Sequence, residues 1–83
     1  MSEIKLPLGL YRHYKGNLYQ VIGLSRHSET MDELVVYQAL YGDYGLWVRP
    51  LHIFLEPVEI DYETVPRFKL IKKLHEKSPP FQR

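Results

Sequence analysis

The sequence contains no cysteine, and this absence excludes two classes of small protein at once. A chain of 83 residues supplies only a small hydrophobic core, and domains of this size often depend on disulfides, bound metal or oligomerisation. Disulfide-stapled domains and zinc sites held by thiolates are both excluded. The core must therefore be held together by packing.

Long apolar runs are also absent, since no segment approaches the roughly 18 apolar residues that cross a bilayer. The first five residues lack the apolar stretch of a secretory signal peptide. We expect a cytoplasmic protein that does not bind a membrane. The length leaves room for one core, so we expect a lead-in over residues 1–8, a single domain over 9–71, and a basic tail over 72–83.

The chain has little excess charge of either sign, with a formal net charge of +1, but the local balance is uneven. Residues 1–28 carry a net +3 and residues 67–83 a net +5, whereas residues 29–66 carry −7. If the fold brings the two basic ends together, they would form a patch that can bind phosphate. The alternative is that segments of opposite sign pair loosely and keep the chain soluble.

The sequence does contain a series of short apolar runs separated by turn residues, a pattern typical of a small all-β barrel or sandwich. Residues 9–15 and 18–26 form a predicted hairpin, because the Gly-Asn pair between them accepts the positive φ of a tight turn. Gly23 inside the second strand predicts a bulge or bend. Residues 34–41, rich in β-branched and aromatic side chains, predict the central strand.

The next elements are shorter. Residues 46–49 predict a strand that Pro50 ends, since proline cannot donate to a strand ladder. Residues 51–54 are too few for a long helix, and they predict a single helical turn that plugs the barrel with Phe54.

A last hairpin is expected from residues 58–60 and 65–68, and the chain beyond it fits two structures. Pro66 followed by apolar residues spaced for one helical face would support a helix over residues 66–77. The interpretation we favour continues the strand to about Ile71, followed by a short basic helical or frayed tail.

Several segments also carry a resemblance to a known family, and they occur in this order: Gly9–Gly16, Tyr19–Val21, His27–Thr30, Val35–Tyr37, Leu40–Tyr41, Trp47–Pro50, Phe54 and Pro66–Phe68. Together they resemble the bacterial family catalogued as domain of unknown function 1653. The resemblance implies an SH3-like fold but no substrate, cofactor or catalytic residue. The predicted fold is therefore mainly β, a small SH3-like barrel of five or six strands with a short basic C-terminal tail or helix.

Aromatic residues make up 13% of the chain, and most of the tyrosines lie in or beside predicted strands. The alternation of side chains along a strand puts Trp47 and Arg49 on one face, Tyr37 on another, and Arg12 on a third. Rings can stack on a base or a methylated amine, and arginine can bind phosphate or carboxylate. The structural alternative is that tyrosines complete the small core with their hydroxyls at the rim.

Arg49 is the only basic residue in the acidic middle segment. Its simplest partner would be Glu29 or Glu33, which would make it part of a structural ion pair rather than a ligand clamp.

The turn after the second predicted strand carries a histidine, a serine and a glutamate in succession. A small hydrolase or lyase would use His27 with Glu29 or Tyr37 as acid and base. The adjacent serine is a poor nucleophile for this histidine, because neighbouring residues on an extended chain point to opposite sides. The alternative is a loop that caps its own backbone, with Thr30 and Glu33 fitting a capping box.

Metal and nucleoside triphosphate chemistry are disfavoured. The four histidines are scattered without the short spacings of a metal site, so we expect no metal ligand. No glycine-rich loop is followed by Lys-Ser or Lys-Thr and a helix that would hold a phosphate. We therefore expect no cofactor.

The hypothesis that follows is a non-catalytic binding module for a nucleic acid, a nucleotide-like ligand or a peptide. The candidate ligand-contacting residues are Arg12, His27, Glu29, Tyr37, Trp47 and Arg49. The alternatives are the small hydrolase or lyase and a structural accessory protein. The chain would be a monomer or a homodimer, since a spare edge strand in a small open barrel invites pairing.

Overall fold

The structure is a computed structural model that describes residues 6–73, in which seven strands and one helical turn occur. In chain order they are β1 (Gly9–His13), β2 (Leu18–Arg26), β3 (Glu33–Ala39), β4 (Leu46–Pro50), α1 (Leu51–Phe54), β5 (Pro57–Ile60), β6 (Glu63–Pro66) and β7 (Phe68–Lys73). Five strands form one antiparallel sheet in the order β4-β3-β2-β1-β7, and β5 pairs with β6 in a separate hairpin. The predicted mainly β fold is confirmed.

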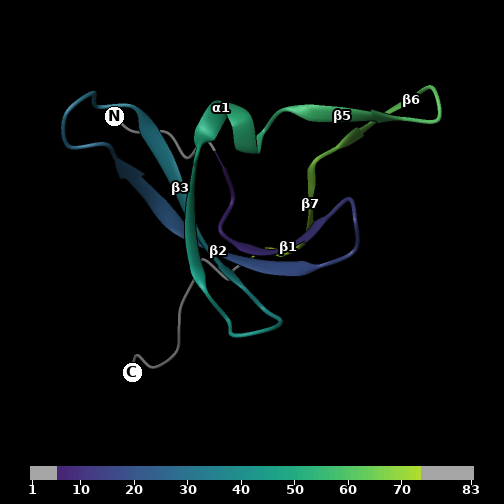
Figure 1. The fold of residues 1–83 in the computed structure, drawn as a ribbon, viewed down its shortest axis with the longest axis horizontal. Helices are drawn as coiled ribbons and strands as arrows, with labels where there is room; N and C mark the ends of the chain where they lie inside the picture. The colour runs from purple at the N-terminus through teal and green to yellow at the C-terminus, as the bar shows by residue number, and fades with distance from the viewer. Residues whose placement is uncertain (1–5, 74–83) are drawn as a thin grey trace.

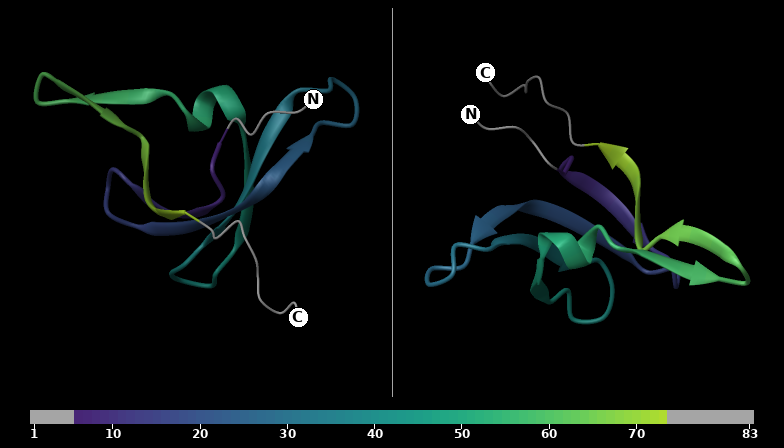
Figure 2. Two further views of the ribbon diagram at one scale, coloured as in Figure 1. Left: turned by 180° about the vertical axis from the view of Figure 1, so that it is seen from behind. Right: turned by 90° about the horizontal axis from the view of Figure 1, so that it is seen from above.

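The five-stranded sheet is strongly curved and encloses the core on three sides (Figure 1). In that view β1 and β2 form the floor, β3 and β4 rise on one side and β7 on the other, while α1 and the β5–β6 hairpin cross the open side (Figures 1 and 2). The expected barrel is therefore not closed, because its edge strands β4 and β7 are linked by α1 and the hairpin instead of pairing with each other.

Local turn chemistry fixes the β1–β2 hairpin where the sequence predicts it. Gly16 has φ 110°, a conformation that side chains disfavour, and its N–H donates to the His13 carbonyl at 2.7 Å. The predicted irregularity at Gly23 is also confirmed, since the β2–β3 register shifts between Val21 and Gly23. This bulge adds bend to the longest strand, as the curvature of a small open barrel requires.

The segment predicted to be the central strand, observed as β3, is an interior strand of the sheet. It lies between β4 and β2, and β2 occupies the middle of the five strands. β3 is nevertheless the best packed strand, with Val35, Tyr37 and Ala39 buried on its inner face. Its high apolar content reflects that burial rather than its position in the order of strands.

The helical turn α1 closes the core as predicted. Pro50 precedes it, and Phe54 at its end is 1% exposed. The Phe54 ring stacks on Phe68 with centroids 4.1 Å apart and meets Tyr11 and Tyr37 edge-on at 5.7 and 5.5 Å. Each such ring pair contributes about 0.5–1.5 kcal/mol beyond burial, so a few of them match the roughly 2–4 kcal/mol of a disulfide.

The chain from Pro57 to Lys73 forms strands rather than the alternative helix. β6 ends at Pro66, and β7 pairs with β1 through Lys73, two residues beyond the predicted end at Ile71. Residues 74–77 of the alternative helix, and most of the predicted basic tail, lie outside the described residues. The β5–β6 turn is tighter than expected, with φ positive at both Asp61 and Tyr62, as in a two-residue hairpin loop.

The core begins before residue 9, since the Leu6 side chain is buried within it. Close by, the buried Tyr11 hydroxyl donates to the Pro7 carbonyl at 2.6 Å, so part of the expected lead-in is attached to the sheet. Over residues 6–73, no helix has the length and hydrophobicity needed to cross a membrane.

Candidate functional site

A pocket of about 250 Å³ opens on the inner side of the sheet, at the end of β3 and the start of β4. Strand register builds it: Tyr37 lies opposite Trp47, Val35 opposite Arg49, and Tyr19 opposite Ala39, so side chains from three strands face the same side. Its lining residues are Tyr19, Tyr37, Tyr41, Trp47 and Arg49. All but one of them are aromatic.

The tyrosine rings of the pocket pack against one another. Tyr19 meets Tyr37 and Tyr41 edge-on, with centroids 5.4 and 5.6 Å apart, and the hydroxyl oxygens of Tyr19 and Tyr41 are hydrogen-bonded at 2.7 Å. Trp47 is 56% exposed, and its Nε1 lies 3.5 Å from the position that a Cβ on Gly45 would occupy. The pocket therefore has a fixed phenolic floor and an open indole wall.

Arg49 supplies the positive charge of the pocket. Its Nε–H donates to the Tyr37 hydroxyl at 3.1 Å, and the guanidinium carbon lies 5.8 Å from the centroid of the Phe68 ring. The sequence led us to expect an ion pair with Glu29 or Glu33, but these contacts turn the guanidinium toward a phenol and a ring. A bound anion could still meet the terminal nitrogens, because the Tyr37 contact uses only Nε.

Burial and charge both shift pKa values at this end of the sheet. Burial, followed by the hydrogen bond to Tyr41, raises the pKa of Tyr19 to about 12, so its phenol stays protonated at neutral pH. Burial lowers the pKa of His13, and the positive charges of Lys15, Arg49 and Arg67 lower it further. Three positive charges thus lie close enough to His13 to favour its neutral form.

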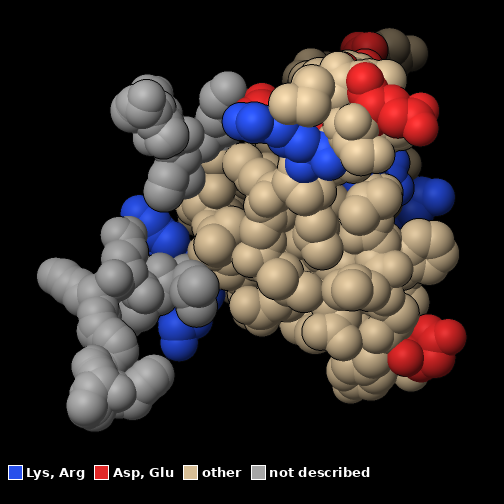
Figure 3. All heavy atoms as spheres, turned by 90° about the vertical axis from the view of Figure 1, so that its left-hand side faces the viewer, with Lys and Arg blue, Asp and Glu red and all other residues tan. Residues whose placement is uncertain are grey.

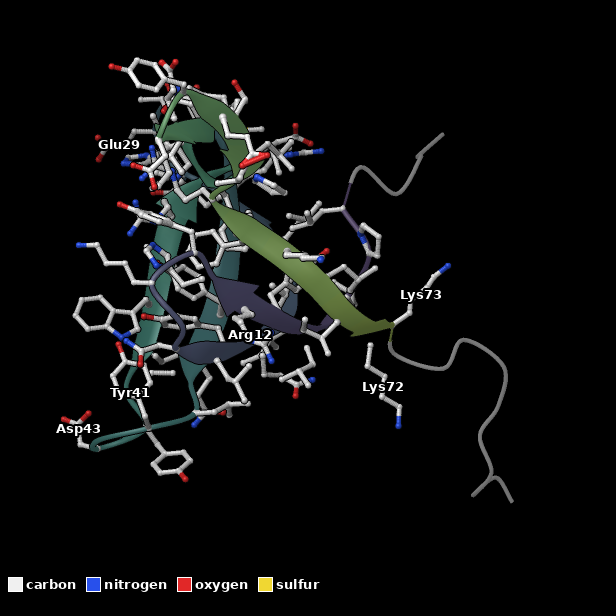
Figure 4. The ribbon with its side chains drawn as sticks, turned by 90° about the vertical axis from the view of Figure 1, so that its right-hand side faces the viewer. Arg12, Glu29, Tyr41, Asp43, Lys72 and Lys73 are labelled. Carbon is white, nitrogen blue, oxygen red and sulfur yellow. The ribbon has the colours of Figure 1, made fainter. Side chains whose placement is uncertain are left out.

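His27 and Glu29 lie in the β2–β3 turn, away from the pocket, and Figure 4 shows Glu29 and Tyr41 at opposite ends of the molecule. His27 Nδ1 accepts the backbone N–H groups of Glu29 and Thr30 at 3.1 and 3.4 Å. This histidine therefore caps its own turn. Thr30 Oγ1 accepts the Asp32 N–H at 3.2 Å, and Glu33 begins strand β3, so no helix starts here for the expected capping box to cap.

The turn does not bring together the acid and base of a hydrolase. Tyr37 pairs with Val21 in the middle of β2, whereas His27 follows the end of that strand, so the two side chains are far apart along the sheet. Glu29 contributes its backbone N–H to His27, not a side-chain contact that would position a proton.

Arg12 also lies outside the pocket, on the opposite side of the sheet. Its neighbour Tyr11 points into the core, so the alternation along β1 directs Arg12 outward, opposite Lys69 of β7. Lys72 lies opposite Leu10 on the same face (Figure 4). The two basic ends of the chain therefore do meet, although on a convex edge and not in a hollow.

A second hollow, also of about 250 Å³, lies between the start of β3 and α1. Its lining combines apolar side chains with three titratable ones: Asp32, Glu33, Leu51, His52 and Leu55. Across residues 6–73, no group of three or more histidine, aspartate or glutamate side chains is placed to hold a metal ion.

The structure thus brings together three of the six predicted site residues, Tyr37, Trp47 and Arg49. The sequence-based selection missed Tyr19 and Tyr41. For Tyr41 a signal exists, since it continues the alternation of Tyr37 and Ala39. Tyr19 joins the site only through its register opposite Ala39, which depends on the bulge in β2.

Comparison with known proteins gives a family but no activity. The family described as "Protein of unknown function (DUF1653)" matches the chain over residues 9–70. The crystal structure of a DUF1653 protein from Bordetella bronchiseptica is similar at 36% identity and a TM-score of 0.76, and the match covers 88% of this chain and 96% of that one. No curated protein matches the chain.

Proposed function

The chain belongs to the DUF1653 family, and from that premise we propose that it is a non-catalytic binding module whose aromatic pocket holds a nucleotide unit. The observation that carries the proposal is one pocket lined by four aromatic side chains and one guanidinium: Tyr19, Tyr37, Tyr41, Trp47 and Arg49. An aromatic wall stacks on a base, and an arginine binds the phosphate attached to it.

The size of the pocket favours one ring rather than a large ligand. Its volume of about 250 Å³ lies below the roughly 300–1,000 Å³ of sites that bury drug-sized molecules. A single base fits this scale, with its sugar and phosphate near the rim. Stacking contributes about 1–3 kcal/mol per base, so binding of one nucleotide will be weak, and a strand that also makes phosphate contacts will bind more tightly.

Charge supports an anionic ligand. Arg49 lies in the pocket itself, where it would bind a phosphate, and Lys15, whose charge also lowers the pKa of His13, would add to the attraction over a longer range. Catalysis is disfavoured because a general acid or base works best with a pKa near the working pH, whereas the pKa of Tyr19 is about 12. The proposal places the domain in the cytoplasm, where nucleotides and single-stranded nucleic acids occur.

The test is a fluorescence titration, since Trp47 is the only tryptophan and lines the pocket. Adenosine monophosphate and a ten-nucleotide oligothymidylate serve as probes, so that the free nucleotide and the strand are distinguished. We expect quenching by both, with the strand binding more tightly and losing affinity as salt rises.

Two variants that each remove one positive charge distinguish binding in the pocket from binding elsewhere on the surface. Arg49→Gln should weaken binding of both probes by at least about tenfold, the loss of one charged hydrogen bond. Arg12→Gln removes the same charge from the convex face and should leave binding of the mononucleotide unchanged. Equal losses in the two variants, or saturation only by an acidic peptide, would contradict the nucleotide assignment.

A further inference from the structure

The two edges of the sheet differ in how they are protected. Edge strands have unpaired backbone groups, and proteins commonly block them with lysine or proline. β7 carries lysines at positions 69, 72 and 73. β4 instead exposes the apolar run Leu46, Trp47 and Val48, with exposed fractions of 56–63%.

The backbone of β4 has donors and acceptors directed away from the sheet. Ala39 N–H donates to the Gly45 carbonyl, and because hydrogen bonds alternate along an antiparallel ladder, Trp47 and Arg49 direct their backbone groups toward β3. Leu46 and Val48 therefore direct theirs toward the open side. Figure 3 faces the side of the molecule where β2, β3 and β4 lie, and its centre has no lysine, arginine, aspartate or glutamate side chain.

We propose that two copies of this chain pair through β4, antiparallel about a two-fold axis at Val48. In that register Val48 lies opposite Val48 of the other copy, and each Val48 N–H donates to the opposite carbonyl. Each Leu46 N–H donates to the Pro50 carbonyl of the other copy. Pro50 has no N–H to return, so the ladder ends there.

The side chains of β4 are self-complementary in this register. Trp47 of each copy lies opposite Arg49 of the other, on the inner face, where an indole and a guanidinium attract each other. On the outer face, Leu46 lies opposite Pro50 and valine opposite valine. No like charges are placed directly opposite each other, and this argues for a second copy over an arbitrary partner strand.

The pairing would add to the pocket described above. Trp47 and Arg49 line the pocket of their own copy, so the indole of the second copy would lie at its rim and extend the aromatic wall. Dimer formation rests on β4 and is measured without any ligand. A chain that does not dimerise would therefore not contradict the nucleotide proposal, and a chain that does not bind nucleotides would not contradict the dimer.

Analytical ultracentrifugation of the full chain tests the pairing. Between about 10 µM and about 1 mM, where small interfaces associate, we expect the mass to rise from 9.9 kDa toward twice that value. Val48→Lys places two ammonium groups opposite each other at the axis, and Val48→Pro removes the outward N–H without removing a bond to β3. Both variants should be monomers.

Ile22→Lys is the matched control, since it adds the same charge at another exposed apolar position, on β2, and should dimerise like the wild type. Circular dichroism confirms that each variant is folded. In the wild type, the exchange of the Leu46 and Val48 amide hydrogens should slow at least tenfold from low to high concentration. A wild type that stays monomeric at 1 mM, or a folded Val48→Lys variant that still dimerises, overturns the proposal.

Discussion

The strands β4 and β7 form the two edges of one sheet, but they differ in which side chains they bury and which they expose. β7 buries Phe68 against the ring of Phe54 and presents lysines to solvent. β4 buries little, but Trp47 and Arg49 line the aromatic pocket. The difference shows that β7 stabilises and closes the fold, whereas β4 leaves an apolar edge and one wall of the pocket accessible within a single copy.

Truncating one aromatic side chain on each edge strand should give the largest difference in unfolding free energy between β7 and β4. Phe68→Ala removes a buried ring and should cost about 3–5 kcal/mol of unfolding free energy, enough to leave a domain of this size largely unfolded. Trp47→Ala should cost about 0.5 kcal/mol, because the indole is mostly exposed. Urea unfolding followed by circular dichroism measures both. Equal losses would show that β4 is as structural as β7.

High pH should destabilise the fold through two tyrosines, the buried Tyr11 of β1 and Tyr19 of the pocket. Burial raises the pKa of Tyr11 to about 12, and Tyr19 reaches a similar value through burial and its hydrogen bond to Tyr41. The folded state therefore favours both neutral phenols. Their stabilisation is complete below pH 10 and is lost as the pH rises from 10 to about 12.

Tyr41→Phe breaks only the pocket pair. We expect the pKa of Tyr19 to fall toward 10 while that of Tyr11 stays about 12, as followed by NMR of the tyrosine ring carbons. If Tyr19 does not move, the hydrogen bond between the two hydroxyls contributes nothing to the shift.

Removing a lysine charge from β7 should change the unfolding free energy by a smaller amount. Arg12 and Lys69 are directly opposite on neighbouring strands, and like charges in that position destabilise a sheet. Lys69→Gln should raise the unfolding free energy by up to about 0.5 kcal/mol at low salt and by less at high salt. Lys73→Gln, opposite Gly9, is the control and should change little. A Lys69→Gln variant that is less stable would contradict the repulsion.

Short-range chemistry accounts for most of what the sequence predicts correctly about the fold. The turn at Gly16, the bulge at Gly23 and the helical turn ending at Phe54 each follow from residues near them in the chain. The openness of the barrel depends instead on how far apart β4 and β7 lie after the whole sheet has curved. No single segment encodes that distance.

The candidate site also depends partly on nearby residues and partly on how distant strands pair. Trp47 and Arg49 are two residues apart on one strand, so alternation alone places them together. Their position beside Tyr37 and Tyr19 depends on the register between strands, which a bulge in β2 shifts by one residue. Residue type alone makes His27 a candidate. The sequence could not reveal that its ring nitrogen is already engaged by the backbone of its own turn.

NMR shift mapping with adenosine monophosphate tests the central claim, that the open edge of the sheet carries a nucleotide pocket. We predict that the largest amide and side-chain shifts occur at the pocket residues: Tyr19, Tyr37, Tyr41, Trp47 and Arg49. The β2–β3 turn and the lysines of β7 should shift little. Shifts centred on Arg12 and Lys69, or on His27 and Glu29, would contradict the assignment and move the ligand to the other side of the sheet or to the turn.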